Sequence, residues 1–259
     1  MIYDLLKAYR VYLVDNLQPA TAETYYKKLC LLFEGQSISD TIGKLDIDKI
    51  LKKLGKIKYK SNFSQAKNAF LHFCDFQNIR LSPQTLEHIR ELATGARKRY
   101  RKLKPILYSE IDKKIKRIRD KRLKLSYQTM IATGLRVAEL SDIAPDNCQV
   151  TNDGIAFIFT ARGGTKAVIT VSATEHLKLY QDLQALIENT LESNSKKLFY
   201  SANFLQRKAK ALGFACHDLR RAFAKLEYKK TRNKARIMDK LRHKSIKATN
   251  IYLRSKVKI

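Results

Sequence analysis

The sequence predicts a mainly α-helical protein with one small β-hairpin or sheet, an α+β fold divided into two domains. Apolar residues recur at helical spacing through most of the chain. Residues 154–172 instead hold two β-prone runs around a Gly-Gly pair, which is typical of a hairpin. Small residues, a dense basic run and a proline between the two halves predict a domain at 1–95, a basic linker at 96–105 and a second domain at 106–259.

The chain is strongly basic. Its 259 residues include 52 Lys and Arg against 24 Asp and Glu, a formal charge of +28. Residues 1–95 carry +4 of this charge and the remainder carries +24. This excess favours a polyanion as partner, most often nucleic acid. A hydrophobic fraction of 44% is ordinary for a globular protein and argues against a disordered basic tail.

The sequence gives no sign of a membrane segment or a secretion signal. No apolar run approaches the roughly 18 residues of a membrane span. The first residues lack the charged region, apolar stretch and cleavage site of a signal peptide. We therefore expect a cytoplasmic protein with no membrane partner.

The first domain is predicted to be a helical bundle of about ninety residues. Helices are expected over these segments: 1–17, from Ala20 or Thr21, 45–54, 61–76 and from Ser82, which precedes a proline. Phe63, Phe70 and Phe73 recur at helical spacing, so we expect them in the core and not stacked on bases. Nothing in this domain has a catalytic pattern.

The second domain combines helices with the hairpin. Ser109 is expected to cap a helix, with Asp112 completing a weak capping box. Another helix is expected from about Arg122 to Ala132, ended by glycine so that Arg136 lies near the start of the next helix. From residue 173 to the end the pattern is helical again.

The cysteines indicate neither a disulfide framework nor a zinc site. They are Cys30, Cys74, Cys148 and Cys216, far apart and without a Cys-x-x-Cys pair. Acidic residues do not cluster at metal-ligand spacing either. We expect no metal and no cofactor.

A set of polar residues in the second domain suits phosphodiester chemistry. His217 and Arg220 are three positions apart at a helix start, so both project from one face. Downstream lie His243 and Tyr252, and Arg136 precedes them all. Two guanidiniums can bind the non-bridging oxygens of one phosphate and stabilise added negative charge. A tyrosine can attack phosphorus to form a phosphotyrosine, and a histidine can move protons near neutral pH.

These motifs resemble the tyrosine recombinase (phage integrase) family over nearly the whole chain. QPATAETYYKKL resembles the opening of the family's helical, SAM-like core-binding domain, and PILYSEIDKKI resembles the entry to its catalytic domain. ATGLRVAEL is similar to box I, HDLRRAFA to box II and LRHKSIKATNIYL to the final motif. The resemblance implies a catalytic set of Arg136, His217, Arg220 and His243 with Tyr252 as the nucleophile.

Two positions depart from the family pattern. The family usually has Gly where Arg242 stands, before the second histidine. It also places a catalytic lysine on the hairpin turn, which here reads TARGGTKAVITV. Lys166 is the only lysine in this turn, whereas alignment by the glycines puts Arg162 in the role. Because an arginine pKa above about 12 makes a poor general acid, we favour Lys166 as the catalytic residue and regard Arg162 as a candidate contact to the DNA backbone.

The resemblance implies site-specific recombination without a metal, on DNA held in a clamp between the two domains. The two arginines and His243 bind the scissile phosphate, and Tyr252 forms a 3′-phosphotyrosine. His217 accepts the proton of the nucleophile, and Lys166 protonates the departing 5′-oxygen. A 5′-hydroxyl of the partner duplex then exchanges strands through a Holliday junction, for integration, excision or dimer resolution.

Double-stranded DNA is the expected partner, with a homo-tetramer that DNA induces at synapsis. The basic run is either a solvated tether or a set of DNA-backbone contacts: Arg97, Lys98, Arg99, Arg101, Lys102 and Lys104. The length suggests a minimal, Xer-like protein without an arm-binding domain. Only seven residues follow Tyr252, few for a helix that docks on a neighbour, so we expect a monomer without DNA. The protein is expected to belong to a prokaryotic cell, or to a mobile element or virus of such a cell.

Other classes of protein share some of these features. A type IB topoisomerase-like enzyme uses similar chemistry but religates the same duplex. A non-catalytic DNA-binding accessory protein would not need the intact set of two arginines, two histidines and a tyrosine. A ribosomal or other RNA-binding protein would account for the charge and leave the ordered motifs unexplained.

Overall fold

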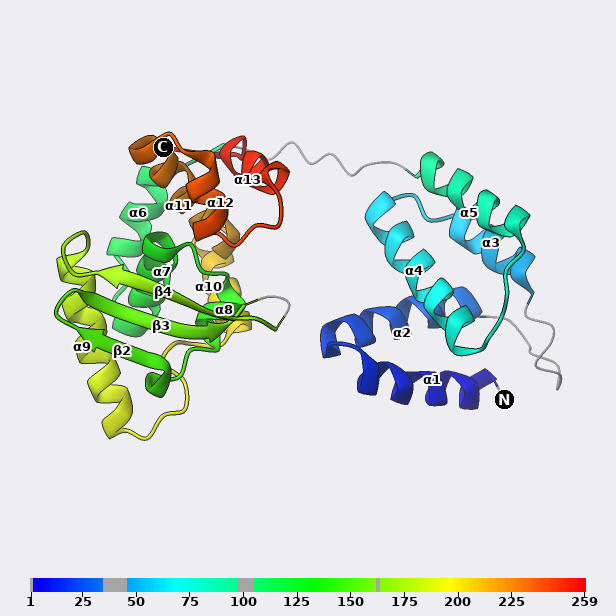
Figure 1. The fold of residues 1–259 in the computed structure, drawn as a ribbon, viewed down its shortest axis with the longest axis horizontal. Coiled ribbons are helices and arrows are strands. Elements are labelled where there is room, and N and C mark those ends of the chain that lie inside the picture. The colour runs from blue at the N-terminus through cyan, green and yellow to red at the C-terminus, as the bar shows by residue number, and fades with distance from the viewer. Residues whose placement is uncertain (1, 35–45, 97–104, 162–163) are drawn as a thin grey trace. The chain divides into compact units, whose positions relative to one another are not determined.

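The computed structural model describes residues 2–34, 46–96, 105–161 and 164–259 of the chain. They form two compact units, one within residues 1–102 and the other within 103–259 (Figure 1). The predicted linker at 96–105 falls mostly on residues 97–104, which lie outside the described residues together with their six basic side chains.

The first unit is a set of helices around a buried apolar core. The helices are α1 (Ile2–Asn16), α2 (Pro19–Phe33), α3 (Ile47–Gly55), α4 (Lys60–Phe76) and α5 (Pro83–Gly95). The helices predicted for this part of the chain are confirmed. Helix α2 begins at Pro19, slightly before the predicted Ala20 or Thr21. Proline fits there because the first helical position needs no backbone N–H.

Helix α4 supplies much of that core. Phe63, Phe70 and Phe73 are each at most 2% exposed. The rings of Phe33 and Phe73 pack edge to face with centroids 5.0 Å apart. Burying each such side chain contributes roughly 1.5–3 kcal/mol. The prediction that these aromatic residues belong to the core is confirmed.

The second unit combines a small sheet with helices, which confirms the predicted α+β class. Its helices are α6 (Tyr108–Lys116), α7 (Lys121–Thr133), α8 (Val137–Ser141), α9 (Leu177–Glu192), α10 (Ala202–Ala211), α11 (Cys216–Thr231), α12 (Lys234–Lys240) and α13 (Ile246–Leu253), with a 3₁₀ turn, η1 (Pro145–Asn147). Its strands are β1 (Ile106–Leu107), β2 (Cys148–Thr151), β3 (Gly154–Thr160), β4 (Lys166–Ser172) and β5 (Val257–Lys258).

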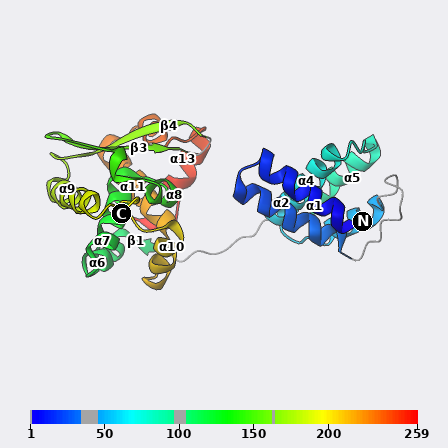
Figure 2. The same ribbon diagram turned by 90° about the horizontal axis from the view of Figure 1, so that it is seen from below.

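The predicted hairpin is present as β3 and β4, to which β2 adds a third antiparallel strand. The register pairs Thr160 with Lys166 at the turn end and Gly154 with Ser172 at the other end. Helices α7 and α9 pack against this sheet, which lies along one side of the unit (Figure 2). Phe159 on β3 is 5% exposed whereas Val168 on β4 is 62% exposed, as expected of a sheet with one covered face.

Two expectations for this unit are wrong. Ser109 does not cap helix α6, which begins at Tyr108 directly after strand β1. The helical pattern also does not run to the last residue, because α13 is followed by β5, which pairs in parallel with β1. This pairing satisfies backbone groups of both short strands and buries Val257 completely.

Among the described residues, no helix is long and apolar enough to cross a membrane. The same part of the chain holds no group of three or more His, Cys, Asp or Glu side chains that could bind a metal ion.

Candidate active site

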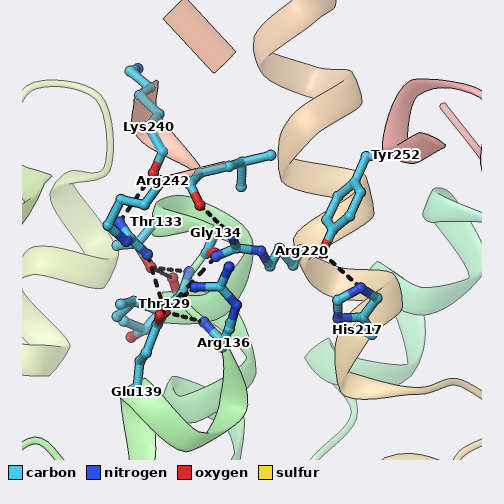
Figure 3. A network of polar contacts seen from close by, with 12 residues as sticks. Thr129, Thr133, Gly134, Arg136, Glu139, His217, Arg220, Lys240, Arg242 and Tyr252 are labelled. Atoms are coloured by element: carbon cyan, nitrogen blue, oxygen red, sulfur yellow. Dashed lines mark hydrogen bonds and ion pairs between the residues drawn. The ribbon is translucent and has the colours of Figure 1, made fainter. Parts of the chain in front are cut away.

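The second unit brings five of the six predicted catalytic side chains into one cluster. Arg136, His217, Arg220 and Tyr252 are labelled in Figure 3. They come from different elements: Arg136 precedes α8, His217 and Arg220 lie on α11, His243 lies in the turn after α12, and Tyr252 lies on α13. Residues distant in sequence therefore converge as the motif resemblance implies.

A glycine turn places Arg136. Helix α7 ends at Thr133, and Gly134 follows with φ of +66°, in the left-handed region that glycine adopts without strain. A β-carbon at Gly134 would lie 2.5 Å from Cδ1 of Phe223, so no larger residue fits. The turn sets Arg136 immediately before helix α8, which confirms the prediction from sequence.

A buried carboxylate that sequence analysis did not single out, Glu139, joins the arginines (Figure 3). Its side chain is 4% exposed. Oε1 accepts a hydrogen bond from Nη1 of Arg136 at 2.6 Å. Oε2 accepts the backbone N–H of Arg136 at 2.8 Å and Nη2 of Arg242 at 3.1 Å, and lies 3.9 Å from Nη1 of Arg220.

Glu139 is ionised although it is buried. Burial alone would raise the pKa of this carboxyl, but the hydrogen bonds from Arg136 and the charges of Arg242 and Arg136 outweigh burial and lower it. One sequence signal could have found this residue: an acid three positions after the arginine, in the first turn of a helix.

Arg220 is fully enclosed, with 0% of its surface exposed. Its Nη1 donates to the carbonyl of Gly134 and its Nη2 to that of Leu241. Burial and the nearby charge of Arg136 lower the pKa of Arg220 to about 10, so it stays protonated at neutral pH. The ring of Tyr252 lies over this guanidinium, 5.9 Å from Cζ to the ring centroid. Because none of its surface is exposed, a ligand can reach Arg220 only if neighbouring groups shift.

Two histidines hold Tyr252. Its Oη lies 2.7 Å from Nε2 of His217. The ring of His243 packs edge to face on the tyrosine with centroids 4.6 Å apart, and Nδ1 of His243 lies 3.0 Å from Oγ1 of the buried Thr249. When Nδ1 of His217 carries the ring proton, Nε2 can accept the proton of the phenol.

Both histidines are expected to be neutral at pH 7. Desolvation, followed by the charges of Arg221 and Arg220, lowers the pKa of His217 to about 4. Desolvation and the charges of Arg220 and Arg136 lower the pKa of His243 to about 4 as well. Since the ordinary histidine pKa is near 6.5, the unfolded chain binds more protons between pH 6.5 and 4, and folding stability should fall over that range as the pH falls.

This expectation can be checked by following the ring resonances of both histidines by NMR from pH 8 to pH 3.5. Variants His217→Gln and His243→Gln assign the signals. We expect midpoints near pH 4 for both rings, and a midpoint near 6.5 for either ring would contradict the electrostatic account.

A second buried carboxylate, Asp218, ties the start of α11 to the end of the chain. Its Oδ2 accepts the backbone N–H of Ala215 at 3.0 Å and lies 3.2 Å from Nζ of Lys256. Nζ of Lys225 on the same helix donates to the carbonyl of Val257. The short segment after Tyr252, expected to be too short to dock as a helix, thus docks as a strand on its own unit.

The two candidates for the hairpin position are Lys166 and Arg162. Lys166 is the first residue of β4 and is exposed. No hydrogen bond or ion pair within the described residues joins Lys166 to the other predicted catalytic side chains. Arg162 lies outside the described residues. The choice between the two for the hairpin position therefore rests on chemistry and not on geometry.

The fold is that of a DNA breaking-rejoining enzyme of the tyrosine recombinase class. Residues 102–258 match the model of the phage integrase family, which covers more than half of the chain. The chain belongs to the phage integrase family and is a tyrosine-type site-specific recombinase.

Solved structures share the fold at low sequence identity. A lambda integrase dimer bound to a COC′ core site has a TM-score of 0.69 and 18% identity, and the match covers 99% of this chain and 98% of that one. A lambda integrase tetramer bound to a Holliday junction has a TM-score of 0.69 and 14% identity over 98% and 78%. XerH recombinase in a post-cleavage complex with a palindromic difH substrate has a TM-score of 0.62 and 17% identity over 92% and 77%. No curated protein matches the sequence significantly.

Proposed function

We propose that this recombinase cuts and rejoins specific DNA sequences through a 3′-phosphotyrosine on Tyr252, without a metal ion. The observation that carries the proposal is the position of the Tyr252 hydroxyl, 2.7 Å from Nε2 of His217, with the tyrosine ring over the buried guanidinium of Arg220. A proton acceptor and a cation thus accompany one nucleophile.

The scissile phosphate binds where positive charge is concentrated. Arg136 uses only Nη1 and its backbone N–H toward Glu139 in the described contacts, so its other guanidinium nitrogens can donate to a phosphate oxygen. When the phosphate enters, the ring of Tyr252 moves off Arg220, which then binds the same phosphate. His243 adds a further donor. Together these donors stabilise the extra negative charge of the pentavalent transition state.

The chemical step moves two protons and exchanges one bond at phosphorus. Oη of Tyr252 attacks phosphorus as His217 takes the phenolic proton. The bond from phosphorus to the 5′-oxygen breaks, and Lys166 protonates that oxygen. A 5′-hydroxyl from a second duplex then attacks the phosphotyrosine and gives its proton to Lys166. Tyr252 leaves and regains its proton from His217, so the exchanged strand is joined. Two such exchanges make and resolve a Holliday junction.

A complete exchange cuts four strands in two duplexes, so the proposed assembly contains four active sites. We assign residues 1–95 to DNA binding, 106–259 to catalysis and the basic linker between them to the DNA backbone. A tetramer forms when the protein binds its sites, which the tetrameric lambda integrase complex supports by analogy. The place of action is the cytoplasm of a prokaryotic cell, where the protein belongs to the cell itself or to its mobile element or virus.

A covalent trapping experiment tests this proposal even though the target sequence is unknown. The protein is incubated in EDTA with a pool of nicked duplexes that carry a randomised core, where loss of the short fragment beside the nick prevents religation. Protein-linked DNA is recovered after denaturation, amplified and selected again. We expect covalent species whose sequences converge on one site, with a free 5′-hydroxyl on the released strand.

The other outcomes separate the competing classes. Covalent species that never converge in sequence would indicate a topoisomerase-like enzyme. Absence of any covalent species, or an absolute need for a divalent metal, would overturn the proposed mechanism.

A further inference from the structure

Arg242 occupies a position where the family usually has glycine, and its side chain contacts Glu139 and the backbone of Lys240 (Figure 3). Nη2 lies 3.1 Å from Oε2 of Glu139, and Nη1 donates to the carbonyl of Lys240 at 3.1 Å. The guanidinium lies over the ring of Phe159, with 4.9 Å from Cζ to the centroid. The side chain is only 19% exposed.

The backbone of Arg242 adopts a conformation that suits glycine better. Its φ is +52°, in the left-handed region where a β-carbon is strained. Glycine would take this turn freely, whereas arginine must offset the strain with its side-chain contacts. The departure from the family pattern is therefore compensated by the contacts of the guanidinium.

These contacts join helix α8, which carries Glu139, to the β3–β4 hairpin. Among the described residues, no other hydrogen bond or ion pair connects these two parts. Glu139 belongs to the helix that follows Arg136 and holds that arginine through Oε1. Phe159 belongs to β3 of the hairpin and pairs with Ala167 of β4, next to Lys166. A planar guanidinium can stack on an aromatic ring and donate in its own plane at the same time, which a lysine cannot do.

We propose that Arg242 is a positioning residue that fastens the β3–β4 hairpin to Glu139, and so holds the hairpin's general acid in line with the phosphate bound by Arg136. This inference rests on the proposed function, in which a hairpin side chain protonates the departing 5′-oxygen. Arg242 acts through Phe159 on one side and Glu139 on the other.

The test compares two DNA substrates that differ in their need for an acid. Both carry the sequence selected by covalent trapping, and one has sulfur in place of the bridging 5′-oxygen at the cut. A thiolate leaves without being protonated, so loss of a correctly placed acid should slow cleavage of the oxygen substrate only. For Arg242→Gly we expect cleavage of the oxygen substrate to fall by about 10²-fold, within the usual contribution of a general acid, and cleavage of the sulfur substrate to change by less than about 3-fold.

Arg232→Gly is the matched control. Arg232 also has a left-handed backbone, with φ of +54°, and also stacks on a ring, that of Tyr228, but it ends helix α11 and contacts none of the cluster. The Arg232→Gly variant should cleave both substrates at the same rates as the unchanged protein. Phe159→Leu keeps the bond to Glu139 and removes the stacking partner, so it should show the same substrate-dependent defect as Arg242→Gly even if that variant fails to fold.

Three outcomes overturn the inference. These are equal defects on both substrates, unchanged cleavage in Arg242→Gly, or, if Arg242→Gly does not fold, a Phe159→Leu variant without the substrate-dependent defect. Failure of the unchanged protein to form an adduct with either substrate would instead refute the proposed function, so the two failures are distinguishable.

Discussion

Tyr252→Phe is expected to abolish the covalent protein–DNA adduct, with a loss of about 10⁴-fold or more in the rate of strand cleavage. The hydroxyl that lies 2.7 Å from Nε2 of His217 is the attacking atom in the proposed mechanism, and no described side chain stands in the same place. Removing a covalent nucleophile commonly costs a factor of this size because the remaining residues act only together with it. The measurement is denaturing gel electrophoresis of the trapped DNA in EDTA.

Binding should survive this change. The variant loses one hydroxyl and one hydrogen bond, worth about 1 kcal/mol, while the ring that packs on His243 remains. We therefore expect affinity for the selected duplex to change by less than about 3-fold, a difference of about 0.7 kcal/mol or less. An intact fold and intact binding would assign the loss of the adduct to the chemical step.

Tyr228→Phe is the matched control for this substitution. Tyr228 packs against the same small cluster of Phe223, Ala224, Ile237 and Leu241 as Tyr252 does. The control should form the adduct at the normal rate. If Tyr252→Phe still forms the adduct, another residue is the nucleophile and the proposed assignment of the site is incorrect.

The local structure around the candidate catalytic residues could be predicted from sequence because these residues lie in short motifs. The glycine that ends α7 sets Arg136 at a helix start, and the spacing of three between His217 and Arg220 puts them on one helical face. Local rules of helix geometry suffice to predict the position of Arg136 and the shared helical face of His217 and Arg220. The hairpin was predictable for the same reason, since a Gly-Gly turn between two β-prone runs is a local signal.

The contacts between motifs could not be predicted in this way. Glu139 looks like an ordinary first-turn acid, and only the fold shows that Arg220 and Arg242 approach the same carboxylate. The pairing of β1 with β5 joins segments from the two ends of the second unit, and each strand is only two residues long. Such short strands have no periodic pattern, so neither they nor the missing cap at Ser109 could be recognised.

Glu139→Ala is expected to destabilise the second unit by about 3–5 kcal/mol, the usual cost of removing one partner from a buried ion pair. The substitution leaves three guanidiniums close together, among them Arg220 with none of its surface exposed. Without the carboxylate of Glu139, no negative charge at this position offsets the mutual repulsion of the three guanidiniums. Urea unfolding followed by circular dichroism measures the effect, with the transitions of the two units fitted separately.

A conservative variant and a surface variant separate charge from general disruption. Glu139→Gln keeps the shape and one acceptor oxygen, so it should cost less than Glu139→Ala but more than a surface change. Glu192→Ala, at the exposed end of helix α9, should stay within about 0.5 kcal/mol of the unchanged protein. A loss below about 1 kcal/mol for Glu139→Ala would mean that the arginines do not depend on this carboxylate.

The combination of Glu139→Ala with Arg242→Gly tests why the carboxylate is needed. Arg242→Gly removes one of the three cations and also relieves the left-handed backbone at that position, so it should lessen the damage done by losing Glu139. We expect the double variant to be more stable than the sum of the single effects predicts, by about 1 kcal/mol or more, as is usual for residues in direct contact. Additive effects would show that Glu139 stabilises the site by some means other than neutralising its arginines. The expected coupling would instead show that Arg242, which stands where glycine is usual, adds a third positive charge beside Glu139. The buried carboxylate then neutralises this charge in addition to those of the two phosphate-binding arginines.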